Sequence, residues 1–89
     1  MIFIDANYLV SLYIKSEYHY NRALEIYHEI EGKKQIISKS IIAETINILH
    51  TKIKAYPEDI ERIYNELINK YQVSFYKYYF NNIFIFPLI

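Results

Sequence analysis

Two carboxylates, Asp5 and Glu44, stand where acidic side chains can bind a metal ion. Asp5 directly follows the apolar run Met1–Ile4, and an acid at the end of a buried strand faces the ligand crevice of an α/β sheet. Glu44 comes 39 residues later, near the start of another apolar segment. Their oxygens would hold a hard divalent cation, Mg²⁺ or Mn²⁺, with waters completing its coordination. Such an ion orients and activates water for attack on a phosphodiester.

Two short apolar segments are expected to form the strands that bring these acids together. Residues 2–5 fit a short buried strand, and Gln35–Ser38 fits a second one. Because helical segments lie between them, a parallel pair with a right-handed crossover is the economical arrangement. Parallel neighbours end on the same side of a sheet, so Asp5 and the first turns after Ser38 are expected to face one crevice.

Four segments are predicted to be helices, and the residues around them supply start and stop signals. Gly32 is expected to end the second helix as a C′ residue. Ser38 or Ser40 suits the N-cap of the third helix, and Pro57 suits the first turn of the fourth. The predicted helices cover residues 8–14, 18–31 and 40–54, and a segment that begins at Pro57.

The last two helices carry apolar stripes that predict which side chains face the core. Glu44 lies about 200° round the helix from Ile42 at 100° per residue, so it is off the main stripe. The expected core residues are Ile42, Ile46, Leu49 and Ile53 on the third helix, and Ile60, Tyr64, Leu67 and Tyr71 on the fourth.

Composition limits the classes of protein and function. At 89 residues, 53% of them hydrophobic, the chain is expected to form one globular domain. It has no cysteine, which excludes disulfides and thiolate metal sites and is compatible with the cytoplasm. Net charge is zero, so any nucleic-acid role must rest on a local patch. Lys33–Lys34 and Lys52–Lys54 are candidates for such contacts or are simply solvated charges.

The C-terminal segment is less regular. Val73–Phe80 fits either a strand or a helix, and Ile83–Phe86 resembles a strand that Pro87 stops. The tyrosines of 71–80 either stack on bases or pack in a core or an interface. The apolar stretch from Val73 is too short and too polar for a membrane-spanning helix, so no membrane role is expected.

Ordinary structural roles compete with the functional ones. Asp5 also suits the N-cap of the helix that follows it, and Glu44 also fits a solvated helix face. The acids that follow Pro57 fit a favourable interaction with a helix dipole. The remaining metal-ligand candidates are isolated on helices, and surface or partly buried roles are expected for them: His19, His28 and His50.

Several of these motifs, taken in order, resemble the PIN-domain family, and in particular its VapC-type ribonuclease toxins. The likeness covers about residues 1–70. The motifs that carry it are Phe3-Ile4-Asp5-Ala6-Asn7 at the start, Ser16-Glu17-Tyr18-His19 with Ala23, and Ile36-Ile37-Ser38 followed by Ile42-Ala43-Glu44.

The resemblance implies a PIN-like α/β fold, with a short parallel sheet flanked by helices, and a metal-dependent endoribonuclease of the toxin–antitoxin type. Carried over by position, Asp5 and Glu44 are its catalytic and metal-binding acids, with Mg²⁺ or Mn²⁺ as the cofactor. Asn7 and Ser38 are polar neighbours of that site. The implied partners are an RNA substrate and a cognate antitoxin, and a homodimer is a further expected partner state of this chain.

This chain departs from the family in one respect. The family has a third acid at least as far beyond Glu44 as Glu44 lies beyond Asp5, at or after position 83, and residues 83–89 contain no acid. We therefore expect residues 1–89 to form a partial PIN-like domain that lacks the C-terminal part and is impaired as an enzyme. A fragment, a frameshifted product and a divergent small relative all fit. The alternative function is a non-catalytic interaction protein that binds an antitoxin or self-associates.

Overall fold

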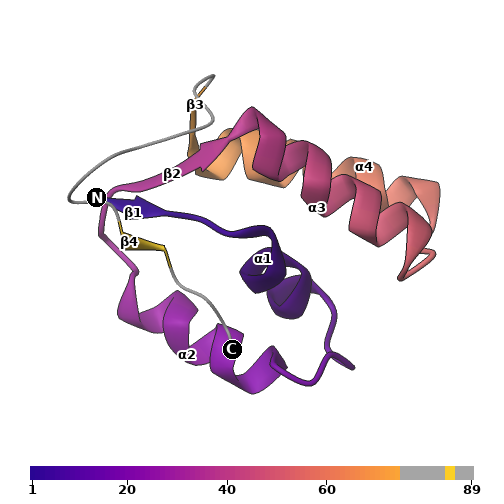
Figure 1. Ribbon diagram of the computed structural model, residues 1–89, viewed down its shortest axis with the longest axis horizontal. Helices are drawn as coiled ribbons and strands as arrows, with labels where there is room; N and C mark the ends of the chain where they lie inside the picture. Colours follow the sequence, from indigo (N-terminus) through magenta and orange to yellow (C-terminus); the bar gives the residue numbers. More distant parts are fainter. Residues whose placement is uncertain (75–83, 86–89) are drawn as a thin grey trace.

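The computed structural model describes residues 1–74, 84 and 85, which form four parallel strands and four helices (Figure 1). The order of strand, two helices, strand and two helices expected from the sequence is confirmed. The elements are β1 (Ile2–Phe3), α1 (Ala6–Tyr13), α2 (Tyr20–Glu29), β2 (Gln35–Ser38), α3 (Lys39–Thr51), α4 (Pro57–Lys70), β3 (Gln72–Ser74) and β4 (Phe84–Ile85).

The strands form one parallel sheet in the order β3-β2-β1-β4. In the register of the central pair, Phe3 lies opposite Ile36. On its other side β1 pairs with β4, where Phe3 lies opposite Ile85, and β2 pairs with β3, where Ile37 lies opposite Val73. The predicted α/β class and the parallel pairing of the first two strands are therefore confirmed, and that pair is the centre of a wider sheet.

Alternation along the strands divides the buried side chains between the two faces of the sheet. Ile2, Ile4 and Ile37 belong to the main hydrophobic cluster, whereas Phe3 and Ile36 are buried without belonging to it. Figure 1 shows the strands at one end of the molecule, with α3 and α4 side by side and extending away from them. All four helices contribute to the main cluster, through Tyr8, Leu9, Ala23, Ile26, Ile42, Leu49, Ile63 and Leu67.

The helices begin and end at residues with the expected chemistry. Asp5 and Ser38 cap α1 and α3 with their side chains, and Pro57 is the first residue of α4. Gly32 lies one position beyond the predicted C′ place, because the C-cap of α2 is Ile30, and its φ of +82° is a left-handed conformation that costs glycine little. Lys54 adopts φ of +57° in the turn between α3 and α4, a conformation that is uncommon for a residue with a side chain.

The prediction that Tyr64 faces the core is wrong, because its side chain is 44% exposed. The buried positions of α4 are Ile63 and Leu67, one turn apart, so the core face of the helix is turned away from Tyr64. The strand predicted at 83–86 is confirmed for Phe84–Ile85. The other predictions for residues 75–83 and 86–89 lie outside the described residues. Within the described residues, no helix has the length and apolar character needed to cross a membrane.

Candidate metal-binding site at the sheet edge

Three polar residues stand in a row where the parallel strands end. Ser38 of β2 lies opposite Ser74 of β3 in the register. The ladder between β1 and β2 continues past Phe3, because the Ile4 N–H donates to the Ile36 carbonyl at 2.9 Å. The next residue after Ile4 is Asp5, which therefore lies beside Ser38. The carboxyl ends of these strands present a carboxylate and two hydroxyls along one edge.

Asp5 is the N-cap of α1, so the structural role expected for it is confirmed. Its Oδ2 accepts the backbone N–H of Asn7 at 3.1 Å. Within the described residues, its other carboxylate oxygen accepts no hydrogen bond. That oxygen is not among the buried side-chain atoms without a partner in the described residues, so it has access to solvent. Capping therefore uses one oxygen of Asp5, fixes the orientation of the carboxylate, and leaves the second oxygen open to a ligand.

Ser38 caps α3 in the same way but is 1% exposed. Its Oγ accepts the Ile41 N–H at 3.1 Å and lies 3.1 Å from the Ser40 hydroxyl. This serine is therefore a polar neighbour of Asp5 whose main task is to fix the start of the helix that carries Glu44.

Glu44 lies on α3 between two positions that are tied to the β1–α1 junction. On one side is Ser38, which lies beside Asp5. On the other is Ile48, one turn later and about 40° round the helix from Glu44, which lines a cavity together with Asn7. The Glu44 side chain is exposed and, within the described residues, forms no ion pair. Its position is compatible with a carboxylate that serves the same crevice as Asp5.

Several carboxylates elsewhere on the surface form ion pairs with an arginine. Arg22 pairs with Glu25 at 3.0 Å and with Glu29 at 3.4 Å along α2. On α4, Arg62 approaches Asp59 at 3.7 Å and Glu66 at 3.9 Å. Glu44 has no such partner in the described part of the chain, so its charge is available to a cation from solution.

The donor atoms around this edge fit a hard divalent cation. They are the carboxylates of Asp5 and Glu44, the Asn7 amide and the hydroxyls of Ser38 and Ser40, and Mg²⁺ and Mn²⁺ prefer oxygen ligands of this kind. Among the described residues, no group of three or more His, Cys, Asp or Glu side chains converges to hold a metal. A cation bound by two carboxylates would therefore keep several of its waters.

A cavity of about 340 Å³ opens beside the site, between α1 and the C-terminal part of α3. Three of its lining residues are charged or titratable: Lys52, predicted as a possible phosphate contact, and Glu17 and His19, noted only within a family motif; the sequence did not predict that the three meet at one cavity. No local sequence pattern links these residues, because they come from two separate segments that only the fold brings together. The lining is completed by Asn7, Val10, Ser11, Ile48 and Ile53.

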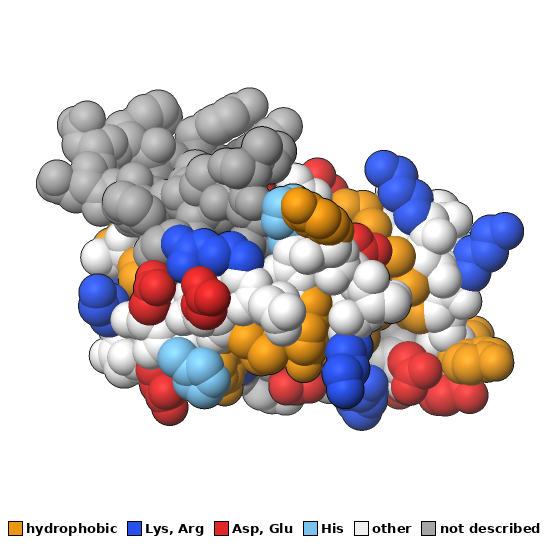
Figure 2. Space-filling view, turned by 90° about the horizontal axis from the view of Figure 1, so that it is seen from below, with side chains coloured by type: hydrophobic (Ala, Val, Ile, Leu, Met, Phe, Trp, Pro, Cys, Tyr) orange, Lys and Arg blue, Asp and Glu red, His pale blue; other side chains and the backbone are white. Residues whose placement is uncertain are grey.

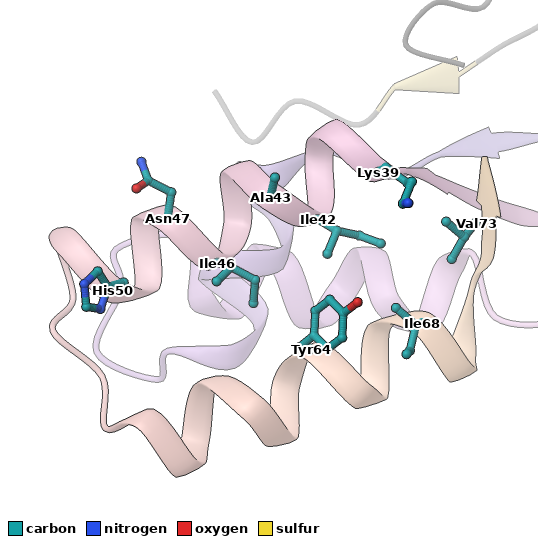
Figure 3. A pocket seen from close by; sticks show the side chains of 9 residues that line it. All are labelled: Lys39, Ile42, Ala43, Ile46, Asn47, His50, Tyr64, Ile68 and Val73. Carbon is teal, nitrogen blue, oxygen red and sulfur yellow. The ribbon is translucent and has the colours of Figure 1, made fainter. Parts of the chain in front are cut away.

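A second, apolar groove of about 520 Å³ lies between α3 and α4. Figure 3 shows Ile42 and Ile46 of α3 pointing toward Tyr64 and Ile68 of α4. His50 stands at one end of the groove, and the other end is lined by Lys39 and Val73. His28 lies elsewhere, on α2, where its Nδ1 is 3.9 Å from Glu31. The histidines are thus separated, as expected from their isolation along the chain.

Tyr8 anchors α1 from its buried side. It is 1% exposed, and within the described residues its hydroxyl has no hydrogen-bond partner. Burial raises the pKa of the Tyr8 hydroxyl, and the nearby Tyr27 and Tyr13 raise it further. Burial is also the main cause of the raised pKa of Tyr71. These phenols stay neutral at physiological pH, so they act in packing and leave the charged chemistry to the sheet edge.

Charges of both signs are intermingled across the described surface seen in Figure 2. This pattern agrees with the net charge of zero. No model of a known protein family matches the chain, and no curated protein sequence matches it. The features that bear on function are thus those of this chain: the row of polar strand ends, the position of Glu44, and the two hollows beside α3.

Proposed function

We propose that this protein is a divalent-metal-dependent endoribonuclease in which Asp5 and Glu44 hold Mg²⁺ or Mn²⁺. One observation supports this assignment above the others. Glu44 lies between Ser38, which neighbours Asp5 at the strand ends, and Ile48, which shares a cavity with Asn7. Two acids far apart in the chain are thus carried by neighbouring elements that start from one edge of a parallel sheet, where α/β proteins bind ligands.

Each residue of the site has a task that follows from its contacts. The Asn7 N–H holds one oxygen of Asp5, so the carboxylate keeps one orientation while its second oxygen stays open. Ser38 fixes the first turn of α3 and thereby the position of Glu44 relative to the strand ends. When bound, Mg²⁺ or Mn²⁺ would supply Lewis-acid activation of a water molecule and neutralise charge on a phosphodiester.

The resemblance to PIN-domain ribonuclease toxins makes RNA the expected substrate and a toxin–antitoxin pair the expected setting. The parallel sheet and the place of Asp5 at a strand end support a PIN-like fold. We expect weak metal binding and slow cleavage by this chain, because two carboxylates leave most of the coordination to water. Catalytic groups that act as a unit also lose most of their effect when some are absent.

An RNA cleavage assay with purified protein tests the proposed function. We expect cleavage that requires Mg²⁺ or Mn²⁺, stops on addition of a chelator, and is lost in Asp5→Asn and in Glu44→Gln. Glu58→Gln, which changes an exposed acid in the first turn of α4, is the matched control and should cleave like the wild type. Cleavage that persists in Asp5→Asn or in chelator would show that the activity does not depend on this site.

A second function is favoured by the apolar groove: a non-catalytic interaction protein that self-associates through α3 and α4. Tyr64 and Ile68 are 44% and 38% exposed at the groove, which is also lined by Ile42 and Ile46. The same surface thus offers both projecting side chains and a hollow to receive them. A two-fold interface needs this self-complementarity.

Sedimentation velocity separates self-association from the first proposal. We expect a dimer in the wild type if the groove takes a second copy, and a monomer in Ile68→Glu, which places a charge in the apolar interface. Glu61→Lys changes an exposed residue of the same helix and should leave the dimer intact. A wild-type monomer at high protein concentration would exclude self-association and leave a different partner, such as an antitoxin, for this groove.

A further inference from the structure

The cavity between α1 and α3 has the size and lining of a ligand-binding site, and neither Asp5 nor Glu44 lines it. Its volume of about 340 Å³ falls within the range of small-ligand sites. Asn7 lines the cavity and also donates its N–H to Asp5, so one residue links the cavity to the proposed metal site. A group seated here would lie next to whatever is bound at Asp5.

The rim of this cavity combines an aromatic platform with a cation. Tyr18 is 92% exposed, and its ring meets that of the cavity residue His19 edge to face, with 4.8 Å between ring centroids. Lys52 lines the same cavity and, within the described residues, forms no ion pair. Exposed aromatic rings beside free cations are the features that bind single-stranded nucleic acids, by stacking on bases and contacting phosphates.

Residues near the cavity add further cationic and aromatic side chains. The turn that follows Lys52 carries Lys54 and Tyr56, and Tyr56 is 71% exposed. Figure 1 shows this turn and the segment between α1 and α2, which includes Tyr18, at the end of the molecule away from the sheet. Figure 2 shows several Lys or Arg side chains at that end, together with a group of acids. Exposed tyrosines and lysines thus lie at the same end of the molecule, alongside acids of the first turn of α4.

Glu17 adds a selective element to the cavity. Its carboxylate lies in the same lining as Lys52, and no ion pair joins the two side chains in the described part of the chain. A carboxylate repels phosphate but accepts hydrogen bonds from the exocyclic amines of bases. A nucleotide would thus place its phosphate toward Lys52 and an amine-bearing base edge toward Glu17, and uracil has no such amine.

We propose that the cavity between α1 and α3 binds one unpaired nucleotide of a single-stranded RNA, next to the phosphate that is cleaved. Lys52 contacts the backbone phosphate, the exposed Tyr18 ring, braced edge to face by His19, stacks on the base, and Glu17 selects a base with an exocyclic amine. This proposal rests on the proposed ribonuclease function, which supplies RNA as the substrate and the metal site as the neighbour. It assigns specificity to residues outside the metal site.

Fluorescence anisotropy with labelled oligoribonucleotides, in chelator so that no cleavage occurs, tests the proposal. We expect Tyr18→Ala to raise the Kd for single-stranded RNA about tenfold, the loss of one stacked base. Lys52→Gln should raise the Kd and lower the slope of log Kd against log salt by about 0.7, the loss of one phosphate contact. Oligocytidine should bind more tightly than oligouridine, and Glu17→Ala should remove that difference.

The controls use the same residue types at other surfaces. Lys33→Gln, in the turn after α2, and Tyr64→Ala, in the groove between α3 and α4, should leave the Kd unchanged. Circular dichroism checks the fold of each variant, and the exposure of Tyr18 and Lys52 makes both tolerant positions. Unchanged affinity in Tyr18→Ala and Lys52→Gln would overturn the proposal, as would equally tight binding of duplex RNA. Tighter binding of single-stranded DNA would overturn the choice of RNA.

Failure of the ribonuclease function can be distinguished from failure of RNA binding by the cavity. Asp5→Asn should leave RNA affinity in chelator unchanged, because the cavity residues are intact, while abolishing metal-dependent cleavage. RNA binding that follows the predicted pattern without any metal-dependent cleavage by the wild type would overturn the nuclease function alone. It would leave the cavity as a single-strand binding site.

Discussion

The two strand–helix junctions of the sheet share a backbone design and differ in the side chain that caps the helix. At the first, Asp5 accepts the Asn7 N–H and is half-buried, with one oxygen open. At the second, Ser38 accepts the Ile41 N–H at the same distance of 3.1 Å but is 1% exposed. Both residues satisfy a helix terminus, so capping alone does not require an acid. The charge and exposure of Asp5 are what suit it to a cation.

Moving a charge to the second junction should give the largest effect. Ser38→Asp places a carboxylate where the serine is 1% exposed, and we expect it to lower the free energy of unfolding by about 3 kcal/mol, because a buried charge lacks a partner. Urea unfolding at neutral pH measures this. Ser40→Asp, at an exposed position in the first turn of the same helix, is the control and should change stability little. Equal costs for the two substitutions would contradict the difference between the junctions.

Removing the buried cap should have the next largest effect. Ser38→Ala leaves the Ile41 N–H without its acceptor and the Ser40 hydroxyl without its neighbour. We expect a loss of about 1–2 kcal/mol in the free energy of unfolding, at the upper end for N-caps because the site is buried. Ser40→Ala should cost less. Ser38→Ala unfolding at the wild-type urea midpoint would show that this cap does not stabilise α3.

The first junction should separate capping from metal binding. Asp5→Ala removes the cap and should cost about 1 kcal/mol, whereas Asp5→Asn keeps a capping oxygen and should cost only a few tenths. Both substitutions remove the negative charge, so both should abolish the stabilisation that added Mn²⁺ gives the wild type. Thermal unfolding with and without Mn²⁺ measures the two effects together. Full Mn²⁺ stabilisation of Asp5→Asn would mean that Asp5 only caps the helix.

The smallest expected effect at neutral pH is that of Tyr8→Phe in α1, because it removes a hydroxyl that has no partner in the described residues. Its effect on the free energy of unfolding should appear at alkaline pH. The folded-state pKa of Tyr8 is raised above its unfolded value of about 10. Neutral Tyr8 therefore contributes stability that is fully present below pH 10 and is lost as the pH rises further. Urea unfolding above that pH should show a weaker pH dependence in Tyr8→Phe than in the wild type.

Local signals in the sequence predicted much of the fold. Pro57, Gly32 and Ser38 marked element ends because their effects depend on one or two neighbouring residues. The strand at Gln35–Ser38 was predicted with its observed bounds. Tyr64 was misplaced because apolar spacing does not fix the rotation of a helix against its neighbours. Leu67 is buried as predicted, but Ile63 is buried in place of Tyr64.

The site was less predictable than the fold. Asp5 and Glu44 were identified by type and spacing, and the structure carries them on neighbouring elements, while their joint binding of a metal stays a prediction. The cavity residues Glu17, His19 and Lys52 were not joined by sequence reasoning, because their proximity depends on how α1 packs against α3. Contacts between distant segments depend on that packing, which no local pattern encodes.

A Mn²⁺ titration followed by electron paramagnetic resonance tests the central claim, that Asp5 and Glu44 hold one divalent cation, most directly. We expect one site in the wild type and in the Glu58→Gln control, with binding lost or severely weakened in both Asp5→Asn and Glu44→Gln. The double variant should bind no more weakly than either single variant, because the two acids serve one ion. Unchanged Mn²⁺ affinity in Glu44→Gln would contradict the account, since Asp5 would then have no partner on α3.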